Sequence, residues 1–196
     1  MLIGLTGGLG CGKSPVLKYF EDLGCPVFSS DAVVARLLKT APIKSAIREQ
    51  FSGAVFEADG KVSKKALAER AFSSEEDLRK LESILHPRVL EAIRFFGQVH
   101  ANRVAVAEVP LLFEKNLESM FVKTVCVACS EETALKRYTL ARSVFTAEAR
   151  RRMDLQLPIE EKKKRADLVI DSEQHPDVVK RQVEVLYRRF CLMGRG

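Results

Sequence analysis

The residues best suited to chemistry lie near the start of the chain, in the segment GGLGCGKS at 7–14. This segment matches the pattern G-x-x-x-x-G-K-[ST], which needs glycines because the backbone must curl until successive N–H groups point at one phosphate. Lys13 could then reach the terminal phosphates of a nucleotide, and the Ser14 hydroxyl could bind Mg²⁺. The pattern predicts a nucleotide site with contacts from Gly8, Gly10, Cys11, Gly12, Lys13, Ser14 and Pro15.

A phosphate loop identifies a nucleotide site but not a reaction, and the rest of the sequence narrows the choice. The sequence has no Asn-Lys-x-Asp segment, with which a GTPase would read guanine, and a motor or transporter ATPase is normally longer than 196 residues. A small kinase is another class that uses such a loop. Such an enzyme needs a carboxylate near the acceptor hydroxyl, arginines at the transferred phosphate and a pocket for the acceptor.

Two carboxylates follow predicted strands at the expected edge of the phosphate loop. Asp31 comes after the strand predicted at 26–28, and the carboxyl ends of parallel strands share one edge of a sheet. We therefore expect Asp31 to face the acceptor, although a helix N-cap is its simpler interpretation. Glu108 ends the strand predicted at 103–108 and could hold the hydration shell of Mg²⁺. The alternative is a surface carboxylate at a strand end.

Basic residues supply the remaining candidates. Arg137 and Arg142 lie in a helical stretch that could close over ATP, although arginines on a solvated helix face are common. The run Lys-Lys-Lys-Arg at 162–165 is interpreted as an exposed helix face, although a basic run also suits nucleic acid.

The hydrophobic pattern predicts the scaffold that must position these side chains. Short apolar runs typical of buried strands occur at 2–6, 26–28, 103–108, 122–128 and 168–171. Helical patterns occupy 13–23, 31–38, most of 41–102, 131–153 and 176–192, and His86-Pro87 interrupts the third of these. Such alternation predicts an α/β fold with a five-stranded parallel sheet flanked by helices.

The composition is that of a globular protein, with 46% hydrophobic and 30% charged residues and a net charge of +6. The positive charge suits polyanionic partners, either nucleic acids or phosphorylated small molecules. Without a membrane-length apolar run or a secretory signal, we expect a cytoplasmic protein with reduced thiols. Cys126 and Cys129 have C-x-x-C spacing, but they lie in a strand-like run and are expected to be buried as small hydrophobic residues.

Several separated segments, spread over nearly the whole chain, together carry a resemblance to one family. They are LTGGLGCGKS at 5–14, Asp31, LESILHPRV at 81–89, EVPLLFE at 108–114, the residues 137–142, 152–153 and 156–158, Lys162, and ADLVID at 166–171. In this order they resemble the dephospho-coenzyme A kinases. Many families share the phosphate loop, whereas the ordered set is specific to this one.

The resemblance implies a P-loop kinase fold in a single domain, 1–196. It implies a nucleotide-binding core at 1–39, 103–137 and 157–196, a helical acceptor-binding region at 40–102 and a helical lid at 138–156. The implied reaction is ATP-dependent, Mg²⁺-assisted phosphorylation of the ribose 3′-hydroxyl of dephospho-coenzyme A, the final step of coenzyme A biosynthesis.

The resemblance also implies roles for single residues. Asp31 would orient, and in part deprotonate, the 3′-hydroxyl, while Lys13 and Arg142 would neutralise the phosphoryl group in flight, with Arg137 as a weaker candidate. Ser14 would bind Mg²⁺. The implied lining of the acceptor pocket is His86, Leu111, Leu112 and Phe113. For His86, a packed histidine at a helix break is the alternative.

Four positions depart from the family's usual residues: Pro15, Ser29 and the pair Ser172-Glu173. None removes a central catalytic group, and the last weakens any assignment of adenine contacts there. Two other classes stay open: another small-acceptor P-loop kinase, which should lack the PLLFE segment, and a nucleic-acid binder, which would leave the phosphate loop and Asp31 unexplained. We expect a monomer with ATP and dephospho-coenzyme A as its partners, without nucleic acid or membrane.

Overall fold

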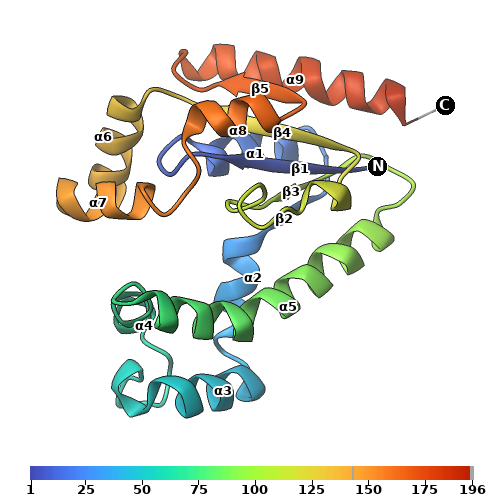
Figure 1. Ribbon diagram of the computed structural model, residues 1–196. Coiled ribbons are helices and arrows are strands. Elements are labelled where there is room, and N and C mark those ends of the chain that lie inside the picture. Colours follow the sequence, from blue (N-terminus) through green and yellow to red (C-terminus); the bar gives the residue numbers. More distant parts are fainter. Residues whose placement is uncertain (143, 195–196) are drawn as a thin grey trace. The chain divides into compact units, whose positions relative to one another are not determined.

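A five-stranded parallel sheet organises the chain, whose computed structural model describes residues 1–142 and 144–194 (Figure 1). The strands are β1 (Leu2–Gly7), β2 (Val27–Ser29), β3 (Ala105–Glu108), β4 (Lys123–Ala128) and β5 (Leu168–Asp171). Their order in the sheet is β2-β3-β1-β4-β5, and every neighbouring pair is parallel. The predicted α/β fold and the number of strands are confirmed.

Segments of a dozen or more residues connect successive strands, as parallel pairing requires, and in the described part of the chain all but the β3–β4 connection contain α-helices. The α-helices are α1 (Lys13–Asp22), α2 (Ser30–Leu37), α3 (Ala41–Phe51), α4 (Lys64–Ala71), α5 (Glu75–Val99), α6 (Glu131–Arg142), α7 (Thr146–Met153), α8 (Ile159–Arg165) and α9 (Pro176–Met193). Short 3₁₀ helices occupy Gly53–Val55 and Glu118–Met120. Within the described residues no helix is long and apolar enough to cross a membrane.

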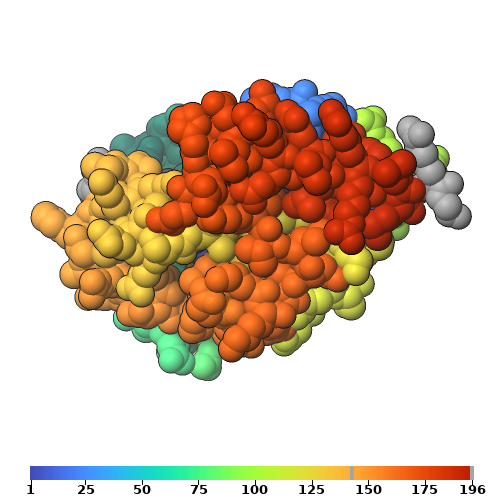
Figure 2. Space-filling model, turned by 90° about the horizontal axis from the view of Figure 1, so that it is seen from above, coloured from blue at the N-terminus to red at the C-terminus, as the bar shows by residue number. Residues whose placement is uncertain are grey.

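The chain divides into two compact units, and the first contains the sheet. Unit 1 comprises Met1–Ser29 and Phe96–Gly196. In its core, α1 packs against α9, whose outer surface is seen in Figure 2. The helix α9 buries Val179, Val183 and Phe190, which recur at the spacing that places apolar side chains on one helix face.

Unit 2, Ser30–Phe95, is helical and has a hydrophobic core of its own. The fully or nearly fully buried residues of this core are Leu38, Ile43, Ile47, Phe51, Val55 and Leu67. The second unit begins at Ser30 and so includes α2. The bounds 40–102 for an acceptor-binding region stay a prediction.

Two local expectations need correction. The predicted interruption at His86-Pro87 is wrong, because α5 continues through Pro87. Proline removes the hydrogen bond to the carbonyl four residues earlier, that of Ser83, but Pro87 and Ser83 are both exposed, so water can solvate this carbonyl. Asp31 is not the N-cap of its helix either, because α2 already begins at Ser30.

Candidate functional site

The phosphate loop joins β1 to α1 at the carboxyl edge of the sheet, as predicted. Gly12 caps α1 with φ of 82°, a left-handed conformation that favours glycine. Gly10 also has a positive φ, and a Cβ there would lie only 2.1 Å from the carbonyl oxygen of Ala134. A side chain at position 10 would therefore displace the loop from α6, which explains the glycine in physical terms.

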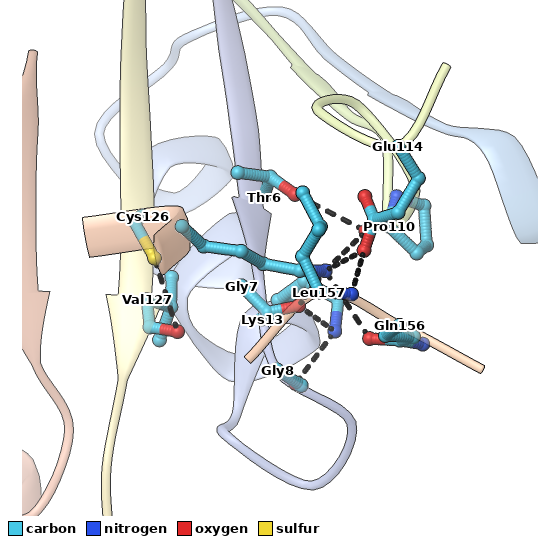
Figure 3. Close-up of polar contacts among 11 residues, drawn as sticks. Thr6, Gly7, Gly8, Lys13, Pro110, Glu114, Cys126, Val127, Gln156 and Leu157 are labelled. Carbon is cyan, nitrogen blue, oxygen red and sulfur yellow. Dashed lines mark hydrogen bonds and ion pairs between the residues drawn. The ribbon is translucent and has the colours of Figure 1, made fainter. Parts of the chain in front are cut away.

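Lys13 begins α1 and is buried, with 9% of its surface exposed. Its ammonium donates hydrogen bonds to the carbonyl oxygens of Gly7 (3.2 Å) and Gly8 (2.9 Å), so it lies over the loop that it follows (Figure 3). Ser14 and Pro15, in the same first turn, are exposed. The loop thus combines a helix N-terminus, a lysine ammonium and an exposed hydroxyl, which together favour binding of an anion.

Glu108 ends β3, where it pairs in register with Leu5 of β1 and Ser29 of β2. Only 3% of its surface is exposed, so the alternative of a surface carboxylate is wrong. Among the described residues there is no cluster of three or more His, Cys, Asp or Glu side chains suited to a metal ion. Magnesium in phosphate sites is commonly held by one or two protein oxygens together with substrate phosphates, a pattern that Ser14 and Glu108 fit.

Lys162 contradicts the interpretation of 162–165 as an exposed helix face. Its side chain is completely buried, and its ammonium pairs with Glu114 Oε1 at 2.8 Å. The same ammonium donates to the carbonyl oxygens of Pro110 (3.0 Å) and Gly7 (3.5 Å) and to Gln156 Oε1 (3.2 Å). Sequence reasoning missed this contact set, because Lys162 is followed by two lysines that remain partly or largely exposed.

The thiol of Cys11 in the phosphate loop meets that of Cys129, the residue after β4, in the interior. Cys129 donates to Cys11 across 3.1 Å, and both side chains are buried, as predicted for Cys129 and for Cys126. This hydrogen bond from Cys129, opposed by burial and aided by the charge of Lys13, lowers the pKa of Cys11 to about 7. The five cysteines, all within the described part of the chain, are free thiols.

Arg137 is linked to the phosphate loop through Ser172. The Arg137 guanidinium donates to the carbonyl oxygen of Ser172 at 3.0 Å, and the Ser172 hydroxyl donates to the carbonyl oxygen of Cys11 at 2.8 Å. The adjacent Glu173 accepts hydrogen bonds from Thr133 and Ser130, and the hydrogen bond from Thr133 is the largest cause of its lowered pKa. The Ser172-Glu173 pair therefore ties β5 to both the loop and α6.

The candidate acceptor residues fall in different environments. Asp31 is exposed in the first turn of α2, and His86 is half-buried on α5 with an Nε2 atom that has no hydrogen-bond partner among the described residues. Leu112 and Phe113 lie in the interior of unit 1, with 0% and 1% of their surface exposed, and Leu111 is half-buried. Arg142 ends α6, and its side chain lies outside the part of the chain that the structure describes.

Comparisons with known proteins identify the family of the chain. The family model described as dephospho-CoA kinase matches residues 1–177. The dephospho-CoA kinase of Halalkalibacterium halodurans is 34% identical over 194 residues, which cover 97% of this chain and 96% of that protein. The corresponding protein of Corynebacterium diphtheriae is 33% identical, with 97% of each chain covered.

Solved structures share the fold. The crystal structure of TT1252 from Thermus thermophilus has a TM-score of 0.82 and 30% identity, covering 96% of this chain and 97% of that one. The dephospho-CoA kinase of Campylobacter jejuni has a TM-score of 0.66 and 23% identity, with 97% of each chain covered. The shikimate kinase of Aquifex aeolicus, at 18% identity and a TM-score of 0.53, covers 94% and 95% and shares the fold alone.

Proposed function

Because the chain belongs to the dephospho-CoA kinase family, we propose that it transfers the γ-phosphoryl group of ATP to the ribose 3′-hydroxyl of dephospho-coenzyme A. The products are ADP and coenzyme A, and the reaction is the final step of coenzyme A biosynthesis. The observation that carries this proposal is the family match over residues 1–177, which includes the phosphate loop with its buried Lys13.

The loop amides and the N-terminus of α1 hold the phosphates of ATP, and Lys13 turns from the carbonyl oxygens of Gly7 and Gly8 towards the β- and γ-phosphates. Arg142 and Lys13 neutralise the negative charge on the transferred group, with a smaller contribution from Arg137. Charge on the equatorial oxygens needs stabilisation most in the transition state, so these side chains act on the rate more than on binding.

Asp31 accepts a hydrogen bond from the 3′-hydroxyl and aligns its oxygen with the γ-phosphorus. An exposed carboxylate in the first turn of α2 is accessible to such a substrate. The transition state of phosphoryl transfer is loose, so alignment contributes more than proton removal. His86 and Leu111 contact the acceptor, and the buried Leu112 and Phe113 support the segment from which Leu111 projects.

Ser14 and Glu108 are the residues that would hold Mg²⁺. When bound, the ion would supply positive charge to neutralise the phosphates of ATP. The fit rests on donor chemistry, since an exposed hydroxyl and a strand-end carboxylate are oxygen ligands of the kind that magnesium prefers.

We assign residues 40–102 to acceptor binding, 138–156 to a lid that closes over ATP, and the rest of the chain to nucleotide binding. The protein acts as a cytoplasmic monomer on two small molecules, without a nucleic-acid partner. These assignments rest on the family and on the α6 and α7 helices that occupy the lid segment.

An assay of ADP release with a panel of acceptors tests the proposed function. Dephospho-coenzyme A is expected to support turnover, whereas shikimate, nucleosides and nucleoside monophosphates are not. Filter binding with RNA, on the same preparation, tests for a nucleic-acid partner. Release of ADP with a different acceptor, and none with dephospho-coenzyme A, would assign the chain to another kinase activity.

A further inference from the structure

The completely buried Lys162 carries an inference beyond the reaction itself. Its ammonium contacts acceptors from three separate segments: Gly7 at the start of the phosphate loop, Pro110 and Glu114 after β3, and Gln156 before α8. Thr6, just before the loop, also donates its hydroxyl to the Pro110 carbonyl oxygen at 3.2 Å (Figure 3). One side chain therefore holds together the non-helical segments that surround the phosphate loop.

Stability alone is a weak reason for this arrangement. Burying a lysine and a carboxylate removes both charges from water, and a well-packed apolar pair of similar volume is often as stable or more stable. The Glu114 side chain is 12% exposed, and its Oε2 atom is buried without a hydrogen-bond partner among the described residues. Its Oε1 atom accepts from both Lys162 and the backbone N–H of Leu157.

Lys162 and Lys13 share one acceptor, the carbonyl oxygen of Gly7, at 3.5 and 3.2 Å. Two ammonium groups so close together repel each other, and the Glu114 carboxylate compensates for one of the two charges. If Lys13 turns to a phosphate, the Gly7 carbonyl oxygen keeps Lys162 as a donor. The start of the loop can then retain its shape while its lysine moves.

We infer that Lys162, neutralised by Glu114, is a positioning residue that fixes the start of the phosphate loop while Lys13 engages the transferred phosphate. The inference rests on the proposed phosphoryl transfer. Lys162 itself touches no reacting atom in this account. It acts through the Gly7 carbonyl oxygen, the Pro110–Glu114 segment and Gln156.

The decisive variant removes both charges together. Lys162→Met alone leaves the Glu114 carboxylate buried and unpaired, so its melting temperature is expected to fall by roughly 6–20 °C. Lys162→Met with Glu114→Gln leaves no uncompensated charge, and most of the lost melting temperature should return. In this double variant kcat is nevertheless expected to stay about 10- to 100-fold below the parent, because the loop is misplaced.

A merely structural role predicts a different result. The kcat of the double variant would then recover together with its melting temperature, and that outcome would overturn the inference. Lys163→Met is the matched control, since Lys163 neighbours Lys162 on α8 but makes only a partly exposed ion pair with Glu160. This control is expected to keep the parental kcat and melting temperature.

Hydrogen exchange provides a second measurement that needs no acceptor. With a non-hydrolysable ATP analogue bound, the loop amides at 7–14 are expected to exchange faster in the double variant than in the parent. Equal exchange in the two proteins would also overturn the inference. A parent that protects its loop but does not phosphorylate dephospho-coenzyme A would contradict the proposed function and leave the exchange test of Lys162 valid.

Discussion

The two units of the chain both bury charged side chains, but these side chains have different partners. In unit 1 the buried ammonium groups of Lys13 and Lys162 donate to backbone carbonyl oxygens of the phosphate loop and its neighbours. In unit 2 the buried Asp77 of α5 pairs with Arg70 of α4 at 3.0 Å, and with Lys80 one turn along its own helix.

The buried charges of the two units differ in the parts of the chain that they hold in place. The Asp77 contacts join side chains at the end of α4 and the start of α5, where the N–H of Asp77 is already capped by the Ser74 hydroxyl, so their loss should reduce stability and little else. The carbonyl oxygens of Gly7, Gly8 and Pro110 lie outside the helices and accept hydrogen bonds from the two lysines, and buried carbonyl groups need donors. Buried charge in unit 1 therefore determines the shape of a binding site, whereas in unit 2 it stabilises a scaffold.

The largest expected effect is on turnover and comes from Asp31. It would show that unit 2 takes part in the reaction as well as serving as a scaffold. Asp31→Asn should leave ATP binding nearly unchanged and lower turnover by about 10²-fold, the lower end of the range for a general base, because a loose transition state needs alignment more than proton removal. Steady-state ADP release and calorimetric titration with an ATP analogue measure the two quantities. Glu21→Gln, on the exposed face of α1, is the control with unchanged turnover.

Turnover within about threefold of the parent would remove Asp31 from the mechanism, since that loss is far below the range for such residues. The contrast between the two units would then be stronger, because every side chain assigned to phosphoryl transfer itself would belong to unit 1.

Asp77→Asn tests the claim that buried charge in unit 2 serves stability and not the reaction. The amide keeps the shape of the side chain but loses the charged hydrogen bond to Arg70, so the free energy of unfolding should fall by about 1.5–3 kcal/mol. The value of kcat should not change. Urea denaturation and ADP release measure both effects.

Glu75→Gln is the matched control for this prediction, because it breaks an exposed ion pair with Arg79 on the same helix. Exposed pairs of this kind contribute about 0–1 kcal/mol. A fall in kcat of the Asp77→Asn protein, at an assay temperature where circular dichroism shows it still folded, would show that unit 2 does not use buried charge for stability alone.

Pro15 predicts a smaller effect, confined to nucleotide binding. It occupies the first turn of α1 and is exposed, so its ring causes little strain there. Proline has no N–H, and the residue after a Lys-Ser pair usually donates one to the α-phosphate. Pro15→Thr should therefore tighten binding of an ATP analogue by roughly three- to tenfold, since a tenfold change is about 1.4 kcal/mol.

Turnover of the Pro15→Thr protein should change little, because the α-phosphate gains no charge during transfer of the γ-phosphoryl group. Pro15→Ala is the control, since it restores the N–H without adding a hydroxyl and should tighten binding similarly. Equal or weaker binding by both variants in calorimetric titration would mean that proline only stiffens the start of the helix.

The smallest expected effect is on stability and comes from Asp167 of unit 1, which immediately precedes β5 at the amino ends of the strands. Burial alone would raise the pKa of Asp167, but hydrogen bonds from Lys123 and Thr124 outweigh it, and the pKa is lowered. Its stabilising contribution is present above the pKa of the unfolded chain, about 3.9, and is lost as the pH falls through the lower folded value.

Asp167→Asn should therefore reduce the free energy of unfolding by at most about 1 kcal/mol at pH 7, because the ion pair with Lys123 is partly exposed. The difference from the parent should shrink as the pH falls below 4, and kcat should not change. A difference that stays constant between pH 7 and pH 3 in urea denaturation would contradict this assignment.

The parts of the fold that depend on nearby residues could be predicted from the sequence. The phosphate loop, its strand and its helix are contiguous, and the expected strand at 168–171 has the bounds of β5. The Pro87 prediction failed because the local rule against proline within a helix gives way when the freed carbonyl is exposed and the following face is buried, as at Val89 and Ile93.

The missed contacts join residues distant in the sequence. Lys162 approaches Gly7 across 155 positions and Cys129 approaches Cys11 across 118. Neither approach leaves a periodic signal in the sequence. A lysine run at 162–165 carries the same pattern whether its first member is solvated or enclosed, and tertiary packing decides which occurs.

The position of the phosphate in the product tests the central claim most directly. We expect that incubation with ATP, Mg²⁺ and dephospho-coenzyme A gives one new phosphate, which phosphorus NMR and fragmentation mass spectrometry place on the ribose 3′-oxygen. The 3′-deoxy analogue of the acceptor should give no product. Phosphate on any other atom, or ADP formed at the same rate with the 3′-deoxy analogue, would contradict the account.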